Sequence, residues 1–224
     1  MGVYEDKGYD PMTQEWRCGV ARLSEGKRDM GVAELGGYLY CVGGRDGMVH
    51  LSTVEKYDPG GNRWCKMAPT GLGMAVLDGY VYAIGGSDGQ SPLYSVERYN
   101  PEEDAWSSCS PLGTYRENFG CATLQGKIYT VSGHDDFTEL CSAERFDPVT
   151  NEWSPMMPMK SKRNKVKAAA ANGYLLAIGG GGVDGVTHVT TVEAFDLDAN
   201  KWRPFGNTKT SYPDGDVAVL KMTI

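Results

Sequence analysis

The sequence predicts an all-β fold made of one unit that is repeated four times. Three features carry this prediction: regularly spaced tryptophans, regularly spaced glycine doublets and a recurrent strand-like hexapeptide, all in the same phase. Internal repeats with periods of roughly 20–50 residues are typical of solenoids and propellers, in which each repeat is one supersecondary unit. No segment shows an apolar period near 3.6 residues, so we expect helix to be nearly absent.

The tryptophans and the glycine doublets keep constant distances along the chain. The tryptophans fall at 16, 64, 106, 153 and 202, with spacings of 48, 42, 47 and 49 residues. The doublets are Gly43-Gly44, Gly85-Gly86 and Gly179-Gly180, and Ser132-Gly133 holds the same place in the third copy. Because several landmarks stay in register through four copies, the repeat is a property of the fold.

A hexapeptide lies between each doublet and the next tryptophan. It begins as Val-Glu-Lys-Tyr-Asp-Pro at residues 54–59 and recurs at 96–101, at 143–148 and, without the proline, at 192–196. In the first full copy the strand-like stretches are 31–35, 38–42, 52–57 and 63–67, and turn-forming residues separate them. Four short strands at a period near 47 residues describe the blade of a β-propeller.

The order Gly-Gly, then Val-Glu-x-Tyr-Asp-Pro, then Trp resembles the kelch repeat, and the resemblance covers almost the whole chain. It implies a kelch β-propeller that forms a single domain over residues 1–224. It also implies that the glycines permit close backbone packing and that the Tyr or Phe and the Trp fill the space between blades. We therefore expect Trp64, Trp106, Trp153 and Trp202 in the core.

The two chain ends predict a further blade. Four full repeats have inner strands that start near residues 31, 73, 120 and 167, while residues 8–16 match only the last half of a repeat. Residues 214–220 look like one more inner strand, and the resemblance implies that such ends close the ring in one blade, which removes the free sheet edge. We predict five blades; a shortened six-bladed form is the alternative.

One linker is shorter than the others. Trp64 and Gly86 are 22 residues apart, whereas the corresponding distances in the other copies are 27 or 28 residues. Some five residues are missing around Pro69-Thr70, where the other copies carry a basic residue.

Composition restricts the environment and the classes of partner. The net charge is −7, which argues against bulk affinity for nucleic acid or anionic membrane. No stretch approaches the roughly 18 apolar residues of a membrane helix, and the acidic residues 1–6 do not resemble a signal peptide. The six cysteines include no Cys-x-x-Cys pair, so we expect buried free thiols in a reducing compartment and a cytoplasmic protein.

Binding residues are expected on one face of the propeller. Strand direction alternates in an antiparallel blade, so the loop after the second strand and the linker before the next inner strand open on the same face. Basic residues gather at these positions, and arginines there suit carboxylate or phosphate groups, so an acidic peptide motif is the expected ligand. Two tyrosines are candidate anchors. The predicted partner-binding residues are Arg28, Arg45, Tyr115, Arg116, His134, Arg163, Lys165 and Tyr212.

Structural alternatives exist for several of these residues. Arg116 and Arg163 can instead pair with Glu144 and Glu193, which recur once per repeat, and the basic run 160–167 can be an ordinary solvated loop. The recurrent Asp46, Asp88 and Asp135 are better explained as turn-formers than as ligand contacts.

Catalysis is not expected. His50, His134 and His188 belong to different blades, which argues against a three-histidine metal site, and no Gly-x-Ser-x-Gly nucleophile elbow occurs. The glycine run 179–182 lacks the Lys-Ser/Thr of a phosphate loop. We expect no enzyme activity, no cofactor and no metal.

The repeats resemble most those of BTB-kelch adaptor proteins. That resemblance implies a propeller that captures substrates for a cullin-type ubiquitin ligase, with the ligase contacted by BTB and BACK domains that this sequence does not contain. The expected function is therefore protein binding as a substrate-recognition module. An actin-associated kelch scaffold is the alternative, and a metal-dependent kelch enzyme is the outside alternative.

Overall fold

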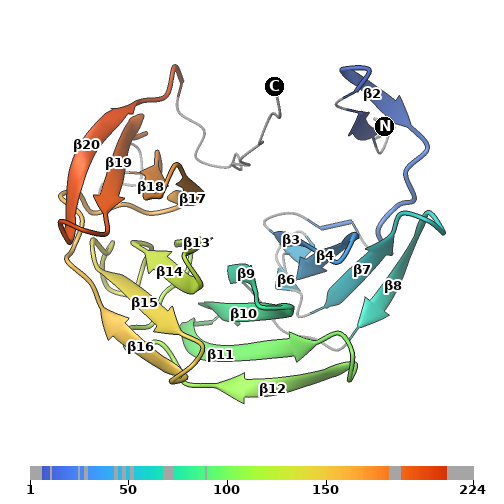
Figure 1. Ribbon diagram of the computed structural model, residues 1–224, viewed down its shortest axis with the longest axis horizontal. Coiled ribbons are helices and arrows are strands. Elements are labelled where there is room, and N and C mark those ends of the chain that lie inside the picture. The colour runs from blue at the N-terminus through green and yellow to red at the C-terminus, as the bar shows by residue number, and fades with distance from the viewer. Residues whose placement is uncertain are drawn as a thin grey trace.

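The computed structural model folds the chain into β-sheets that follow one another along an arc (Figure 1). It describes residues 7–10, 12–24, 26–27, 30–42, 45–46, 49–50, 53–67, 73–88, 90–181 and 188–210. No helix occurs in these ranges, and therefore none that is long and apolar enough to cross a bilayer. The all-β prediction is confirmed.

Four blades correspond to the four full repeats, and each is an antiparallel sheet of four strands (Figure 1). The strands of blade 1 are β3 (Gly31–Leu35), β4 (Tyr38–Val42), β7 (Val54–Asp58) and β8 (Arg63–Met67). Those of blade 2 are β9 (Gly73–Leu77), β10 (Tyr80–Ser87), β11 (Pro92–Asn100) and β12 (Ala105–Cys109). Those of blade 3 are β13 (Gly120–Leu124), β14 (Lys127–Val131), β15 (Ala143–Asp147) and β16 (Glu152–Pro155). Those of blade 4 are β17 (Lys167–Ala171), β18 (Tyr174–Ile178), β19 (Thr191–Asp196) and β20 (Lys201–Asn207).

The hexapeptide and the tryptophan recur together because they pair across the two outer strands of each blade. Four aromatic residues lie opposite the four tryptophans in the strand register, and the ring centroids are 5.0 to 5.4 Å apart. The pairs are Tyr57↔Trp64, Tyr99↔Trp106, Phe146↔Trp153 and Phe195↔Trp202. Cross-strand aromatic pairs of this kind stabilise a sheet beyond their burial alone.

Three of the tryptophans also attach their blade to the chain that precedes it. The indole N–H groups of Trp64, Trp153 and Trp202 donate to the carbonyls of Ala21, Ser110 and Met157, each at 2.9 Å. These acceptors lie between one outer strand and the next blade. Of the four tryptophans expected in the core, Trp202 is buried there, Trp106 and Trp153 are partly buried against core clusters, and Trp64 is partly buried.

Close packing between neighbouring inner strands explains why three of these strands begin with glycine. A Cβ on Gly120 would lie 2.8 Å from the Ala168 Cβ of blade 4, and one on Gly31 would lie 2.8 Å from the Met74 side chain of blade 2. A Cβ on Gly73 would likewise lie too close to the ring of Phe119, the residue that directly precedes β13. Because the next blade already occupies this space, a larger residue would separate the blades.

The glycine doublets mark a left-handed backbone turn at the end of the second strand. Gly85 and Gly86 have φ angles of 49° and 93°, and Ser132, which replaces the first glycine in blade 3, has a φ of 60°. Glycine adopts this region without the strain that a side chain adds.

Further pairing occurs outside the four blades. β1 (Lys7–Asp10) pairs with β2 (Glu15–Cys18) ahead of blade 1, where the sequence predicts the outer half of a closing blade. A small hairpin of β5 (Arg45–Asp46) and β6 (Val49–His50) follows β4. Four blades and a fifth sheet agree with the five-blade prediction, while the expected inner strand at 214–220 lies outside the described residues.

The five cysteines whose side chains are described are free thiols, as expected, but they are not all buried. Cys41 is buried, Cys109, Cys121 and Cys141 are partly buried, and Cys65 is exposed. Burial raises the pKa of Cys41 to about 11 and that of Cys121 to about 12, so both stay protonated at neutral pH. The expectation of burial is wrong for Cys65, because side chains alternate between the two faces of the outer strand β8 and Cys65 lies on its exposed face.

Candidate functional site

In the described part of the chain, the loops after the second strands and the linkers between blades lie on one side of the propeller, which we call the loop face. Main-chain bonds join them: the N–H of Gly86 donates to the Arg116 carbonyl at 2.8 Å, and Glu117 and His134 exchange two bonds of 2.9 Å. Asn164 and Gly181 pair in the same manner in the next blade. Each of these linkers is therefore held between the loops of two neighbouring blades, which makes this face a fixed surface.

Arg116 and Arg163 lie beneath the loop face and not on it. Both are fully buried, and each donates from Nη2 to a glutamate of the following blade at 2.8 Å, Arg116 to Glu144 and Arg163 to Glu193. Burial lowers the pKa of Arg116, and the Glu144 carboxylate acts against this shift. This geometry agrees with the structural alternative stated above, in which Arg116 and Arg163 pair with Glu144 and Glu193.

Further donors and acceptors of the two pairs form hydrogen bonds with the backbone. Nη1 of Arg163 donates to the carbonyls of Gly179 at 2.9 Å and Thr191 at 2.6 Å, and Nη1 of Arg116 donates to that of Ser132 at 2.7 Å. The second oxygen of Glu144 accepts from the N–H of Gly113, and that of Glu193 from the N–H of Lys160. Each pair thus anchors a linker to the blade that follows it.

Blade 1 has an equivalent pair, whereas blade 2 has none among the described residues. Lys27 and Glu55 form a buried ion pair of 2.7 Å. Burial alone would raise the pKa of Glu55, but Lys27 and the N–H of Ser24 hold it below its usual value. In blade 2 the corresponding carboxylate is Glu97, which is partly buried and has no ion-pair partner in the described part of the chain. The short linker that precedes blade 2 carries no basic residue at 68–72.

The exposed part of the loop face is aromatic around blades 2 and 3. Tyr115 is 51% exposed and packs edge-on against Tyr94, which is 43% exposed, with ring centroids 4.5 Å apart. Phe137, in the loop after β14, is 91% exposed. Tyr115 is among the predicted contact residues, whereas Tyr94 and Phe137 are not. Phe137 could have been found, because it is an aromatic residue within the otherwise polar loop Gly-His-Asp-Asp-Phe-Thr.

Lysines lie close to these rings. Lys160 and Lys162 are exposed, and Lys162 Nζ donates to Thr138 Oγ1 at 2.8 Å, next to Phe137 in the chain. Lys165 is partly buried and has a φ of 55°. The linker between blades 3 and 4 therefore adds exposed positive charge to the loop face beside the aromatic rings.

His134 takes part in the loop structure. Its Nδ1 accepts the N–H of Asp136 at 3.2 Å and lies 3.7 Å from Glu117 Oε1. The neighbouring Asp135 Oδ1 accepts the N–H groups of Phe137 and Thr138. Burial would raise the pKa of Asp135, but these donors lower it.

Asp135 and Asp88 are turn-formers, as expected. Asp88 Oδ1 accepts the N–H groups of Gln90 and Ser91, each at 2.8 Å, which closes the loop after β10. Asp46 lies in the β5–β6 hairpin opposite Val49.

Three predicted contact residues are not placed as side chains. Arg28 and Tyr212 lie outside the described residues, and so does the side chain of Arg45, whose backbone pairs with His50 in the β5–β6 hairpin. Within the described ranges no group of three or more His, Cys, Asp or Glu residues could hold a metal ion.

Comparison with known proteins agrees with the repeat analysis. A model of the kelch motif matches residues 27–71, 69–113, 115–160 and 162–208. Human Kelch-like protein 4 is 42% identical over 64 residues, which are 29% of this chain and 9% of that protein. Human Kelch-like protein 25 is 38% identical over 74 residues, which cover 27% of this chain and 12% of that protein.

Each of these alignments spans only about a tenth of the relative's length. The solved structure of YjhT superposes with a TM-score of 0.76 over 91% of this chain and 77% of that one, at 16% identity. This likeness concerns the propeller fold.

Proposed function

Since this chain belongs to the kelch-repeat family, we propose that it is a protein-binding propeller whose loop face captures an acidic segment of its partner. The observation that carries this proposal is the group of exposed aromatic rings, Tyr94, Tyr115 and Phe137, with exposed lysines 160 and 162 on the same face. Exposed aromatic residues in rigid loops are frequent anchors of interfaces.

The chemistry of this surface suits an acidic peptide. The rings offer apolar area at a low entropic cost, and the lysines offer charge to carboxylate or phosphate groups. Arg116 and Arg163 act here as positioning residues, since they hold the linkers that carry Tyr115 and the lysines. Tyr115, His134 and Lys165 remain proposed contacts.

The cellular setting that we propose is that of a kelch-like adaptor. The matches to Kelch-like proteins 4, 25 and 35 support a substrate-recognition domain that acts in the cytoplasm by binding and not by catalysis. In that setting the ubiquitin ligase supplies the chemistry, and this propeller supplies the specificity.

Affinity capture from cell lysate tests the loop face, with two matched variants. Phe137 and Val149 belong to the same blade and are 91% and 88% exposed, but Val149 lies in the turn between β15 and β16, on the opposite face. We expect Phe137→Ser together with Tyr115→Ser to lose the captured proteins, because the anchors are gone, while Val149→Ser retains them. Circular dichroism establishes that all variants remain folded.

The charge of the partner is tested separately. Lys160→Glu/Lys162→Glu should weaken binding of a captured partner by at least about ten-fold, with reduced salt dependence. Equal capture by the Phe137→Ser/Tyr115→Ser variant and the parent protein would contradict the proposed face. Unchanged binding by the lysine variant would contradict the acidic ligand, and capture of actin filaments would favour the scaffold alternative.

A further inference from the structure

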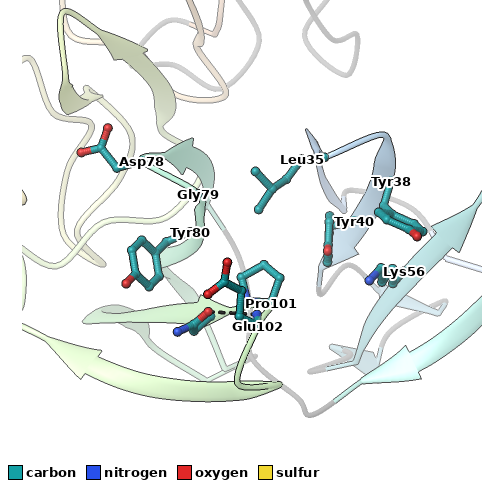
Figure 2. Close-up of a pocket in the computed structure, with 11 residues that line it drawn as sticks. Leu35, Tyr38, Tyr40, Lys56, Asp78, Gly79, Tyr80, Pro101 and Glu102 are labelled. Carbon is teal, nitrogen blue, oxygen red and sulfur yellow. Dashed lines mark hydrogen bonds between the residues drawn. The ribbon is translucent and has the colours of Figure 1, made fainter.

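A groove lies between blades 1 and 2 on the side of the propeller opposite to the loop face, which we call the turn face. It has a volume of about 420 Å³ and is lined by the turn after β3, the turn after β9 and the turn after β11. In Figure 2 Asp78 and Tyr80 form one wall, Tyr38, Tyr40 and Lys56 form the other, and Glu102 lies between the walls. The groove is therefore separate from the surface proposed above.

The walls of the groove are aromatic. Tyr38 and Tyr80 line it from opposite blades, and Tyr40 lies at its buried end. Lys56 Nζ is 4.0 Å from the Tyr38 ring centroid, and the Arg98 guanidinium is 4.7 Å from that of Tyr80. Cations of their own blades thus hold both rings in position, and each ring remains part of the groove surface.

Carboxylates give the groove its charge. Asp78 and Glu102 are both exposed, and neither has an ion-pair partner among the described residues. With Lys56 the lining carries two negative charges and one positive charge, a net charge of −1. The negative groups belong to blade 2 and the positive group to blade 1.

The other described interfaces between blades lack this combination. The residues that correspond to Asp78 and Glu102, counted from the inner turn and from the tryptophan, are Gln125 and Val149 in blade 3 and Asn172 and Asp198 in blade 4. Only the interface between blades 1 and 2 places two carboxylates beside tyrosines within the described part of the chain.

From this combination we infer that the groove binds a basic side chain, preferably arginine, of an extended partner segment. A guanidinium stacks on aromatic rings and can donate hydrogen bonds to two carboxylates at once, whereas an ammonium is only a point charge. The charge of the groove is complementary to such a segment and opposite to that of the lysines on the loop face.

Fluorescence polarisation with labelled hexa-arginine, hexalysine and hexaglutamate peptides tests this inference at about 0.15 M salt, where distant charges are screened. We expect hexa-arginine to bind more tightly than hexalysine and hexaglutamate not to bind. Asp78→Asn/Glu102→Gln should raise the Kd for hexa-arginine at least ten-fold. Asparagine suits position 78, since Asp78 has a φ of 50°.

A charge-matched control separates the groove from the general acidity of the protein. Glu103→Gln/Asp198→Asn removes the same two charges at exposed positions that do not line the groove. We expect its Kd to change by less than two-fold. Equal weakening by both double variants, or no binding by the parent protein, would overturn the inference.

Two further measurements identify the occupant. Tyr38→Leu should remove the preference for arginine over lysine, because the stacking surface is lost; an unchanged preference would contradict the stacking. Sedimentation without peptide measures self-association. A dimer that dissociates in Asp78→Asn/Glu102→Gln would show that a second copy fills the groove, which would replace the proposed occupant.

Discussion

At the residue scale, the main feature is a buried cation that attaches a linker to the next blade. Arg116, Arg163 and Lys27 pair with glutamates at the same position of the third strand. Arg163 makes four hydrogen bonds from its two terminal nitrogens, while its Nε is buried without a partner among the described residues. A planar guanidinium serves carbonyl, hydroxyl and carboxylate groups at once, while the Lys27 ammonium of blade 1 contacts Thr53 Oγ1 and Glu55.

Removing one partner should therefore cost much stability. We expect Arg163→Ala to lower the free energy of unfolding by about 3–5 kcal/mol, because Glu193 remains buried without its cation. The neighbouring exposed Lys162→Ala should change it by less than about 0.5 kcal/mol. Urea denaturation followed by tryptophan fluorescence measures both, and similar small losses would show that the buried pair contributes little.

At the element scale, the linker between β8 and β9 differs from the others. Trp106 Nε1 is buried and has no hydrogen-bond partner among the described residues, whereas the indoles of the other three blades each donate to a preceding carbonyl. Glu97 likewise has no cation in the described part of the chain. In the other blades the corresponding partners come from the preceding linker, which here is residues 68–72, lies outside the described residues and is some five residues shorter.

Lengthening this linker should stabilise the protein. We expect replacement of residues 70–72 by the sequence of residues 112–119 to raise the melting temperature, because the transplanted segment brings an arginine to Glu97. The same transplant with methionine in place of that arginine is the matched control, and it should raise the melting temperature by less. If both transplants lower the melting temperature equally, the prediction is wrong, because neither the longer linker nor its arginine stabilises the protein.

At the scale of the whole molecule, stability depends on carboxylates that recur from blade to blade. The pKa of Glu55 lies below its usual value of 4.5, so its ionised form is favoured in the folded protein. A lowered pKa contributes stability that is fully present above the unfolded value and is lost as the pH falls through the folded value. The molecule should therefore lose stability on acidification below about pH 4.5.

Thermal unfolding of the parent protein and of Glu55→Gln as a function of pH measures this contribution. We expect the parent protein to be more stable at neutral pH and the difference to shrink as the pH falls below 4.5. A difference that stays constant over the acid range would show that ionisation of Glu55 is not its source.

The sequence alone determined the repeat, the strand order of each blade and the recurrence of the hexapeptide aromatics with the tryptophans. These features depend on contacts between residues close in the chain, and four copies make the pattern visible. It also identified the two roles open to Arg116 and Arg163, which are contact with a ligand or pairing with a glutamate of the next blade. The face on which the loops meet followed from the sequence as well.

Only the tertiary structure decided which residues are available on that face. Whether a linker cation points inward depends on a glutamate of the following blade, so Arg116 became buried while Tyr115, its neighbour, stayed exposed. The groove of Asp78, Tyr38 and Glu102 is likewise formed by turns of two blades. No spacing within one repeat predicts such a site, because its geometry is set by how neighbouring blades pack.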